Sequence, residues 1–475
     1  MTKQLNMRKL LLITLLLIHF SAFGQKVVCD LHIEITPQCW ASTDEIYTTQ
    51  NSRVFSFFNN LCKVTQTFQL PYAQKDTVYF VLTTPSPFFY MYPLYFQKLT
   101  VREKNTDKEI PFVFQSDTLR IVQPPKLIEI SYYYMPDYFM YGNEWITCIF
   151  APYQQSWFSW YFSVPDMKIN KLTFDVPEHL YFFSNLMRKT TEGETIRLCT
   201  DSIPKNGISF FWAEKRYYER IETTVEANQY NLYLYKDAIL TGDTTSCYAA
   251  LLPAHRVNES MINSRISNLN RVVPQVEKMF QKKVNFDILE ACLDIYNEDD
   301  TIRWGSLFQM SDNHALIVMD TSFWVSHSYL HEIIHAYNDI LPDRNDSSYY
   351  FFHESMTEYL AIYFEYSQQA SRDSVFEAKI LKYVNLEQEY ISIFEINRSA
   401  IGFDLGGTFG VVYLKTPFVI NSFAKRIGVD KFITILSHFY QQVRETQYIN
   451  FYEFEKTLKS YGVSNDNWDW FVKHL

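Results

Sequence analysis

The stretch HEIIHAYNDILPDRNDSSYYFFHESMTEYLAIYF, residues 331–364, reads as two amphipathic helices joined by a polar loop. In the first helix His331 and His335 are four residues apart, which places both imidazoles on one face, one turn from each other. Glu332 lies beside them, close enough to hold a metal-bound water molecule and take its proton. The pattern predicts a site for one metal ion. The competing interpretation is a capped surface helix whose polar residues face solvent.

The residues that flank the first helix predict its two ends. Ser326 or Ser328 is expected to cap the start, because a serine hydroxyl can accept a hydrogen bond from an unpaired N–H of the first turn. The segment Leu341–Pro342 is expected to end the helix, since proline has no N–H and disfavours helical backbone in the residue before it.

A catalytic zinc ion takes three protein ligands and keeps a fourth position open for water. A third histidine six residues after His335, with glycine at the third, would be the metzincin pattern, but Leu341 and Asn338 occupy those positions. Glu354 follows His335 after eighteen intervening residues and starts the next helix, so two antiparallel helices can bring it opposite the histidine pair. Glu358 lies one turn further on and can accept a hydrogen bond from the outer N–H of a ligand histidine.

This arrangement resembles that of the gluzincin peptidases, in particular the family of alanyl aminopeptidase and leukotriene hydrolase. That family has H-E-x-x-H, then eighteen residues, then a glutamate within W-L-N-E-G-F-A-E-Y. The corresponding stretch here is FFHESMTEYLA, which keeps Glu354, Glu358 and Tyr359 in register. It departs from the family pattern at two positions, with His353 in place of asparagine and Ser355 in place of glycine.

The resemblance continues downstream, where the family carries a catalytic tyrosine in Y-x-K-G, followed by a helix and a Gly-x-x-x-Phe step. The segment VVYLKTPFVINSFAKRIGVDKFITIL supplies Tyr413, Lys415, Gly428 and Phe432 in matching order, with Thr416 where glycine is usual. The resemblance implies that the Tyr413 hydroxyl stabilises an oxyanion that develops on the substrate.

The resemblance implies a zinc metallopeptidase that hydrolyses peptide bonds, and an aminopeptidase in particular. It assigns one Zn²⁺ per chain to His331, His335 and Glu354, and it makes Glu332 the general base that takes the proton of an activated water. An endopeptidase and a non-catalytic binding module that keeps the zinc are the alternatives, and a folded scaffold without metal is a third. The expected partners are peptide substrates, and the sequence leaves any protein partner unspecified.

The sequence departs most from the family at the motif that binds the free amino group of the substrate. The family has G-x-M-E-N on a strand upstream of the zinc helix, and its glutamate binds the amine. The corresponding region here is WGSLFQMSDNHALIVMD, in which Met310, Asp312 and Asn313 are similar to the motif. Asp312 is therefore the candidate amine-binding residue. A turn before a strand is the competing interpretation of the same residues.

The chain falls into two differently patterned parts. Over residues 25–228, short runs rich in β-branched and aromatic residues alternate with Pro and Asn or Asp turns, which predicts an antiparallel β domain. Over residues 229–475, apolar residues recur at helical spacing around a few buried strands, which predicts a mainly helical domain. The expected fold class is α+β, and the resemblance implies that the second domain is a thermolysin-like zinc-peptidase domain.

The resemblance extends to both parts of the chain. The segment SWYFSVPDMKINKLTFDVPEHLYFFSN is similar to a stretch of the family's β domain, and NWDWFVKHL is similar to the end of its catalytic domain. Many members carry a further large helical domain after that point. The resemblance therefore implies a divergent member without that domain.

Residues 1–24 have the pattern of a signal peptide. A basic start is followed by an apolar stretch from Leu10 to about Phe20 and by a small-x-small site, with cleavage expected before Gln25. The apolar stretch is shorter than the ~20 residues that a membrane-spanning helix needs. We therefore expect an exported protein, periplasmic or extracellular, with no membrane span in the mature chain. An uncleaved anchor is the competing interpretation.

The charge of the chain argues against two classes of partner. The chain has 43 Lys and Arg against 53 Asp and Glu, and three of the basic residues lie within residues 1–24, which leaves a mature net formal charge of −13. Such a charge disfavours binding to nucleic acid or to anionic membrane surfaces.

The seven cysteines show no CxxC spacing, so they form neither a zinc-finger nor a thioredoxin motif, and the sequence does not specify their pairing.

Overall fold

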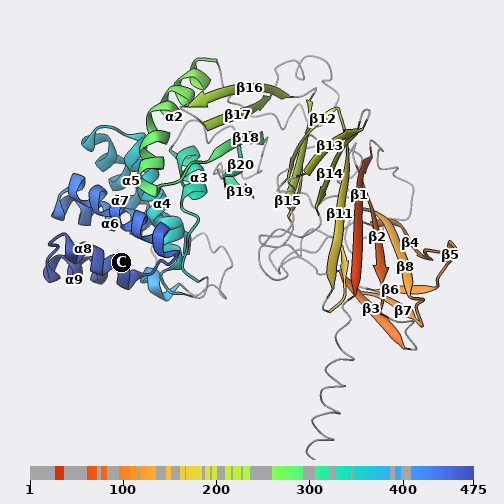
Figure 1. Ribbon diagram of the computed structural model, residues 1–475. Helices are drawn as coiled ribbons and strands as arrows, with labels where there is room; N and C mark the ends of the chain where they lie inside the picture. Colours follow the sequence, from red (N-terminus) through yellow and green to blue (C-terminus); the bar gives the residue numbers. More distant parts are fainter. Residues whose placement is uncertain are drawn as a thin grey trace, which may run out of the picture. The chain divides into compact units, whose positions relative to one another are not determined.

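The chain divides into two compact units, Met1–Arg216 and Tyr217–Leu475, each of which is described by itself (Figure 1). The predicted signal peptide, residues 1–24, lies outside the described residues. The computed structural model describes residues 27–36, 61–71, 76–82, 96–115, 118–134, 146–150, 161–165, 167–184, 188–192, 195–200, 209–215, 218–225, 228–235, 259–291, 305–311, 313–320, 327–343, 346–385, 391–396 and 408–475.

The first unit is built around an eight-stranded sheet of order β13-β14-β11-β1-β2-β8-β4-β5 (Figure 1). Neighbouring strands pair antiparallel except β1 and β11, which run parallel. The β-rich first part is as predicted, but the parallel pair was not, because a long connection separates the two strands and leaves no local pattern. The strands are β1 (Val28–Thr36), β2 (Leu61–Gln69), β4 (Phe96–Glu103), β5 (Lys108–Glu109), β8 (Leu127–Tyr134), β11 (Lys168–Pro177), β13 (Arg188–Glu192) and β14 (Thr195–Thr200).

Two smaller sheets belong to the same unit. One has the order β10-β3-β7-β6 and the other β12-β15-β9. Their strands are β3 (Thr77–Leu82), β6 (Phe112–Gln115), β7 (Thr118–Val122), β9 (Ile146–Phe150), β10 (Phe162–Ser163), β12 (Leu180–Ser184) and β15 (Ser209–Glu214).

Apolar side chains of the eight-stranded and four-stranded sheets form one core. The rings of Phe68 and Phe80 meet edge to face, with centroids 4.7 Å apart. The fully buried Gln66 has its amide satisfied in this core, because Nε2 donates to the Phe162 carbonyl at 2.9 Å and Oε1 accepts from the Phe162 N–H at 2.7 Å. These bonds fix β2 of the large sheet to β10 of the small one, since a buried amide without partners would be costly.

The second unit contains a five-stranded sheet of order β16-β17-β18-β20-β19. The two inner pairs, β17 with β18 and β18 with β20, are parallel, and the outer pairs are antiparallel. The hairpin of β16 and β17 spans the boundary that the sequence predicts between residues 228 and 229. The strands are β16 (Tyr218–Val225), β17 (Asn228–Tyr235), β18 (Asn285–Ala291), β19 (Gly305–Ser311) and β20 (His314–Asp320).

Helices make up most of the remaining second unit, as the spacing of its apolar residues predicts (Figure 1). Two of them, α4 and α6, continue directly from short π-helical turns named η5 and η8. The helical segments are α2 (Glu259–Phe280), α3 (Ser328–Tyr337), η5 (Phe351–Ser355), α4 (Met356–Glu365), α5 (Gln369–Asn385), η6 (Ile393–Glu395), η8 (Gly410–Lys415), α6 (Thr416–Ile427), α7 (Val429–Thr446), α8 (Phe451–Ser460) and α9 (Asn465–His474).

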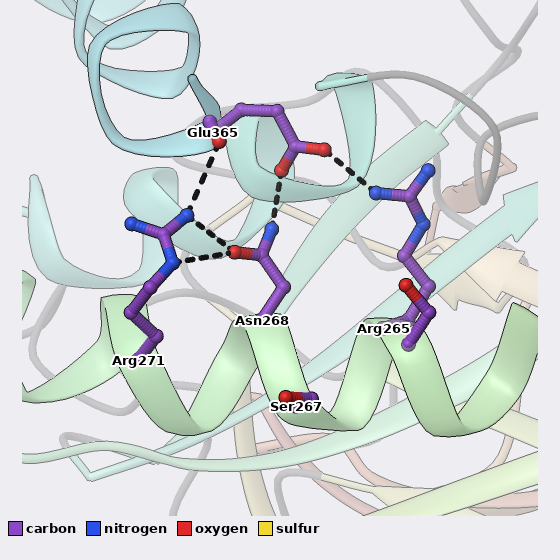
Figure 2. A pocket seen from close by; sticks show the side chains of 6 residues that line it. Arg265, Ser267, Asn268, Arg271 and Glu365 are labelled. Carbon is purple, nitrogen blue, oxygen red and sulfur yellow. Dashed lines mark hydrogen bonds and ion pairs between the residues drawn. The ribbon is translucent and has the colours of Figure 1, made fainter. Parts of the chain in front are cut away.

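A polar cluster attaches α2 to the end of α4 and lines a pocket of about 310 Å³ (Figure 2). Arg265 Nη1 donates to Glu365 Oε1 at 2.7 Å, and the Asn268 amide donates to the other carboxylate oxygen. Arg271 Nη2 donates to the carbonyl oxygens of Phe364 and Glu365, at 2.8 and 3.1 Å. The last carbonyls of a helix lack partners within it, so Arg271 satisfies the end of α4.

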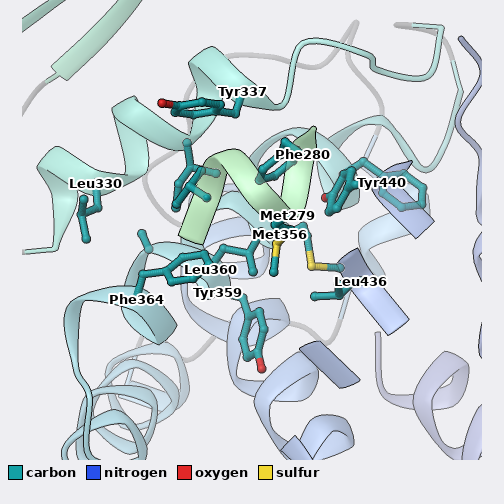
Figure 3. Packing of buried hydrophobic residues seen from close by; sticks show 14 of the residues in the cluster. Met279, Phe280, Leu330, Tyr337, Met356, Tyr359, Leu360, Phe364, Leu436 and Tyr440 are labelled. Atoms are coloured by element: carbon teal, nitrogen blue, oxygen red, sulfur yellow. The ribbon is translucent and has the colours of Figure 1, made fainter. Parts of the chain in front are cut away.

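The helices α2, α3, α4 and α7 pack around one hydrophobic core (Figure 3). Phe280 at the end of α2 lies between Tyr337 of α3 and Tyr440 of α7, with ring centroids 6.3 and 4.3 Å apart. Tyr359 of α4 is 1% exposed and stacks on Phe376 of α5 at 5.8 Å. Burial of large rings of this kind contributes roughly 1.5–3 kcal/mol each, which holds α3 and α4 in fixed positions.

The turn between α6 and α7 needs a glycine. Gly428 has φ of 96°, a region that side-chain-bearing residues rarely adopt, and it serves as the end of one helix and the start of the next. Backbone geometry therefore explains why glycine stands at the first position of the Gly-x-x-x-Phe step.

Among the described residues, none of the helices combines the length and the apolar character that crossing a membrane requires.

Candidate metal centre

Helix α3 carries the two histidines of the sequence pattern and forms as predicted, with different ends. His327 occupies the capping position, without a cap bond from its side chain, and Ser328 is the first residue of the helix. The prediction of a cap by Ser328 was therefore wrong. The other candidate, Ser326, lies outside the described residues. The helix ends at Tyr337, before the expected Leu341–Pro342. It ends early because Asn338 leaves the helix, and its side chain donates to the Phe352 carbonyl at 2.7 Å.

Three of the predicted side chains converge on one point. The Nε2 atoms of His331 and His335 are 2.9 Å apart. Glu354 Oε2 lies 3.2 Å from the first of these nitrogens and 3.3 Å from the second. One ligand atom from each side chain lies within 4.8 Å of the others, a spacing that can hold a metal ion.

Glu354 reaches the histidines from the π-helical turn η5. There the Met356 N–H donates to the carbonyl of Phe351, five residues back, instead of four. Such turns widen a helix locally and are frequent at functional sites. Asn338 fixes the turn from the α3 side through the Phe352 carbonyl. The sequence places Glu354 at the start of a helix but does not indicate the wider turn.

The donor atoms fit a cation. His331 Nδ1 lies 2.7 Å from the carboxylate of Glu358, which can only accept, so this nitrogen carries a proton and Nε2 of the neutral ring directs its lone pair inward. That lone pair faces the Glu354 carboxylate and His335 Nε2, an arrangement that is repulsive unless a positive charge lies between them. Two imidazole nitrogens and one carboxylate oxygen are a ligand set that Zn²⁺ prefers.

The electrostatics of the protein alone also favour a positive charge at this point. Burial by itself lowers the pKa of His331, but hydrogen bonds to Glu354 and Glu358 outweigh it and raise the pKa to about 10. Burial raises the pKa of Glu354, yet His353, His335 and His331 together hold it well below the ordinary value. The site therefore attracts either a proton or a metal ion.

Glu358 orients the first histidine. It is 5% exposed, and its Oε2 accepts from His331 Nδ1 while its Oε1 lies 2.8 Å from His327 Nε2 and 2.6 Å from Lys379 Nζ. Burial raises the pKa of Glu358, but Lys379 and His327 lower it well below the ordinary value, so the carboxylate is charged. A charged partner of this kind fixes the ring orientation of a metal-binding histidine.

Tyr413 comes from the second π-helical turn, η8. Its hydroxyl donates to Glu354 Oε2 at 2.7 Å, so it lies at the same point as the two histidines. Burial and the nearby Glu354 raise the pKa of Tyr413 well above its ordinary value, and the hydroxyl therefore keeps its proton. Pro417 explains the wider turn, because a proline ring clashes with the carbonyl four residues earlier, which here is that of Tyr413.

Glu332 is 9% exposed on the same helix as the histidine pair. Burial raises the pKa of Glu332 to about 7, although the neighbouring His331 lowers it. Among the described residues, the Glu332 carboxylate has no hydrogen-bond partner. A buried carboxylate with a pKa close to neutrality can both take and return a proton.

Two residues at this site were absent from the sequence prediction. His327 had a detectable signal, because it lies four residues before His331 and so shares the helix face of the histidine pair. Lys379 had no such signal in the sequence, since it comes from α5 and reaches Glu358 only through tertiary packing.

Asp312, the candidate amine-binding residue, lies outside the described residues, between β19 and β20.

His353, which stands where the related family has asparagine, lies next to the carboxylate of Glu354. Its Nδ1 is 2.5 Å from Glu354 Oε1. Its ring lies between those of His335 and Tyr349, with centroids 4.6 and 5.1 Å away. A third imidazole therefore borders the group of three ligand atoms.

The chain is similar to several solved structures. An aminopeptidase N family protein from Idiomarina loihiensis is similar with a TM-score of 0.58 and 10% identity, covering 93% of this chain and 75% of that chain. An M1 zinc metallopeptidase from Deinococcus radiodurans has a TM-score of 0.49 and 11% identity, covering 95% of this chain and 94% of that chain. Legionella pneumophila aminopeptidase A in complex with aspartic acid has a TM-score of 0.49 and 13% identity, covering 94% and 51%.

Sequence comparisons add no relative, since no protein-family model and no curated protein matches the chain. The likeness to the Idiomarina loihiensis protein, at 10% identity, shows the fold. The resemblance inferred from the sequence motifs is therefore confirmed as a likeness of fold: a β-rich part followed by a helical part, in the architecture of an aminopeptidase N family protein.

Proposed function

We propose that this chain is a zinc-dependent metallopeptidase, and most specifically an aminopeptidase-like hydrolase of the gluzincin type. The observation that carries the proposal is the convergence of His331 Nε2, His335 Nε2 and Glu354 Oε2, from two separate helical segments, on one point. Close to that point lie a protonated hydroxyl, Tyr413, and the carboxylate of Glu332, which has no hydrogen-bond partner in the part of the chain that the structure describes. A purely structural metal site needs neither of these two groups.

In this proposal His331, His335 and Glu354 hold one Zn²⁺ per chain. When bound, the ion supplies a Lewis acid that polarises the scissile carbonyl and activates water. The Glu332 carboxylate takes the proton of the attacking water and returns it to the leaving amine. Its pKa, raised to about 7 by burial, suits both transfers near neutral pH.

Tyr413 and Glu358 complete the proposed machinery. The Tyr413 hydroxyl, which keeps its proton, donates to the oxygen of the substrate as negative charge develops on it. Glu358 holds the Nδ1–H of His331 and so keeps the opposite nitrogen free for the metal. Glu358 acts from a buried position and Tyr413 from a partly buried one, and the contacts of both side chains limit reorganisation during the reaction.

Two further features are the fold of the second unit and the preference for a free amino terminus. We infer that the second unit is a thermolysin-like zinc-peptidase domain, which is supported by the H-E-x-x-H helix packed beside a mixed sheet. Preference for a free amino terminus would require an acidic group near the substrate amine, and Asp312 is the candidate. The substrates proposed are peptides.

The experiment compares peptides with free and with acetylated amino termini. The purified chain is supplied with zinc, and the products are followed by mass spectrometry. Release of one residue at a time from free termini alone supports an aminopeptidase, while cleavage of the blocked peptides establishes an endopeptidase instead. Glu332→Gln is the matched control, because it keeps the shape of the side chain and removes the base.

Three results would contradict the proposal. Undiminished hydrolysis by Glu332→Gln excludes Glu332 as the base. Zinc bound at one ion per chain without cleavage of either peptide set favours a non-catalytic binding module. Elemental analysis that finds no zinc at any supplied concentration leaves only a metal-free scaffold.

We also propose that the protein is exported after cleavage before Gln25. The support is the sequence pattern of residues 1–24, a basic start followed by a short apolar stretch and a small-x-small site. Fractionation of the producing cells, followed by amino-terminal sequencing, tests this directly. A mature protein that begins at Gln25 outside the cytoplasm supports export, and retention of Met1 in the membrane fraction indicates an uncleaved anchor.

A further inference from the structure

Lys379 of α5 lies beside the metal centre without contacting any of its proposed ligands. Its Nζ is 2.6 Å from Glu358 Oε1, and the side chain is 16% exposed. Glu358 is itself 7% exposed at the side chain and uses its other oxygen for His331. A charge pair this well shielded from water is stronger than a surface pair, because little solvent screens it.

The same ammonium group makes a second contact, to the segment that carries the proposed oxyanion donor. Lys379 Nζ donates to the backbone carbonyl of Tyr413 at 3.3 Å. In an α-helix that carbonyl would accept from the residue four positions later, but that residue is Pro417, which has no N–H. Lys379 therefore supplies a side-chain donor to a carbonyl that cannot accept a hydrogen bond from Pro417.

Lys379 and His331 contact opposite oxygens of one buried carboxylate. Glu358 Oε2 lies 2.7 Å from His331 Nδ1, whereas Glu358 Oε1 lies 2.6 Å from Lys379 Nζ and 2.8 Å from His327 Nε2. Loss of Lys379 would therefore remove a contact that fixes the orientation of this carboxylate against His331.

We infer that Lys379 is a positioning residue that couples the two halves of the site, by holding the Glu358 carboxylate in place against His331 and by fixing the backbone at Tyr413. The inference rests on the proposed zinc-dependent function. It assigns to α5 a role that no motif of the sequence indicates. Loss of the lysine is expected to weaken zinc binding through Glu358 and to slow turnover through Tyr413.

The test uses four single variants of the full chain. Lys379→Met removes the charge and both contacts, Lys379→Gln keeps a donor for the Tyr413 carbonyl without the charge, and Lys379→Arg keeps the charge. Lys382→Met is the matched control, since Lys382 is an exposed residue of the same helix. The zinc dissociation constant is measured by competition with a chromophoric chelator, which needs no activity.

Loss of a group that orients a metal-binding histidine typically weakens metal affinity by about 10–100-fold. We expect such a loss for Lys379→Met and Lys379→Gln, recovery in Lys379→Arg, and no change in Lys382→Met. Equal zinc affinity in wild type and Lys379→Gln, with both proteins folded by circular dichroism, overturns the inference. If Lys379→Met does not fold, Lys379→Gln alone decides the outcome.

A double-mutant cycle tests the second half of the coupling. If Lys379 acts on turnover through the position of Tyr413, then Lys379→Met, which removes the contact with the Tyr413 carbonyl, lowers kcat less in a Tyr413→Phe background than in wild type. Additive effects of the two changes on kcat overturn that half. Absence of hydrolysis by the wild type refutes the proposed function, whereas the zinc affinities still decide the role of Lys379.

Discussion

The Ser355 hydroxyl donates to the Val412 carbonyl oxygen at 2.7 Å and joins the two π-helical turns that carry Glu354 and Tyr413. Ser355 is fully buried, and it stands where the related family has glycine. A glycine could not make this bond. The hydroxyl therefore fixes the distance between the segment that supplies a proposed zinc ligand and the segment that supplies the proposed oxyanion donor.

Replacement of Ser355 by alanine should separate the two turns slightly. The buried Val412 carbonyl loses a partner, which costs about 1–3 kcal/mol of unfolding free energy. We expect kcat to fall more than KM rises, because the displaced Tyr413 acts on the transition state. Chemical denaturation and steady-state kinetics measure the two effects. Ser374→Ala, at an exposed position of α5, is the control, and identical behaviour of both variants would refute the role of this bond.

Replacement of Tyr413 by phenylalanine should remove the proposed oxyanion donor and leave the ligands in place. Loss of one such donor lowers kcat by about 10²–10³-fold in other hydrolases. Zinc affinity is expected to change little, since the ring stays and only its bond to Glu354 is lost. Kinetics and chelator competition on the same preparation measure both quantities. A variant with unchanged kcat contradicts the assigned role.

The local parts of the site could be predicted from the sequence. His331 and His335 share a helix face because their spacing matches the helical repeat, and no distant residue is needed to see it. Glu354 and Glu358 follow from a second periodic run after a polar loop. The helical character of the second part is equally local, since apolar residues at positions such as Leu360 recur at the same spacing.

The remaining features depend on distant residues and leave no such pattern. The wider turns at Glu354 and Tyr413 reflect packing and a proline effect on the preceding carbonyl, which periodicity does not register. Lys379 contributes through a salt bridge between two helices. The parallel pairing of β1 with β11 joins strands that are far apart in the chain, where strand propensity alone does not specify a partner.

Removal of the proposed metal should destabilise the second unit. A ligand that binds only the folded state adds about 2.7 kcal/mol at a concentration one hundredfold above its dissociation constant. We expect the unfolding temperature to fall on chelation and to recover when zinc is added back. His335→Ala should abolish this dependence, whereas His179→Ala, at an exposed position of the first unit, should keep it. An unfolding temperature that is insensitive to zinc in the wild type contradicts a bound metal.

Asp339 is placed to make the stability of α3, the helix of His331 and His335, depend on pH. Its carboxylate lies 2.7 Å from Arg444 Nη2 and 2.8 Å from Lys282 Nζ. The same two cations donate to the last carbonyls of α3, at Tyr337 and Ala336. Burial raises the pKa of Asp339, but Arg444 and Lys282 outweigh it and lower the pKa below its ordinary value.

A lowered pKa means that the folded protein binds this proton less readily than the unfolded chain. The contribution of Asp339 is therefore fully present above the unfolded pKa, ~3.9, and is lost as the pH falls through the folded value. We expect Asp339→Asn to cost about 1 kcal/mol at pH 7, because water screens a side chain that is 33% exposed. Urea unfolding should show a smaller difference at pH 3 than at pH 7, because at pH 3 the unfolded chain already binds the proton. Asp469→Asn, at an exposed position of α9, should show none at either pH, and a difference for Asp339→Asn that is as large at pH 3 as at pH 7 would exclude its charge as the cause.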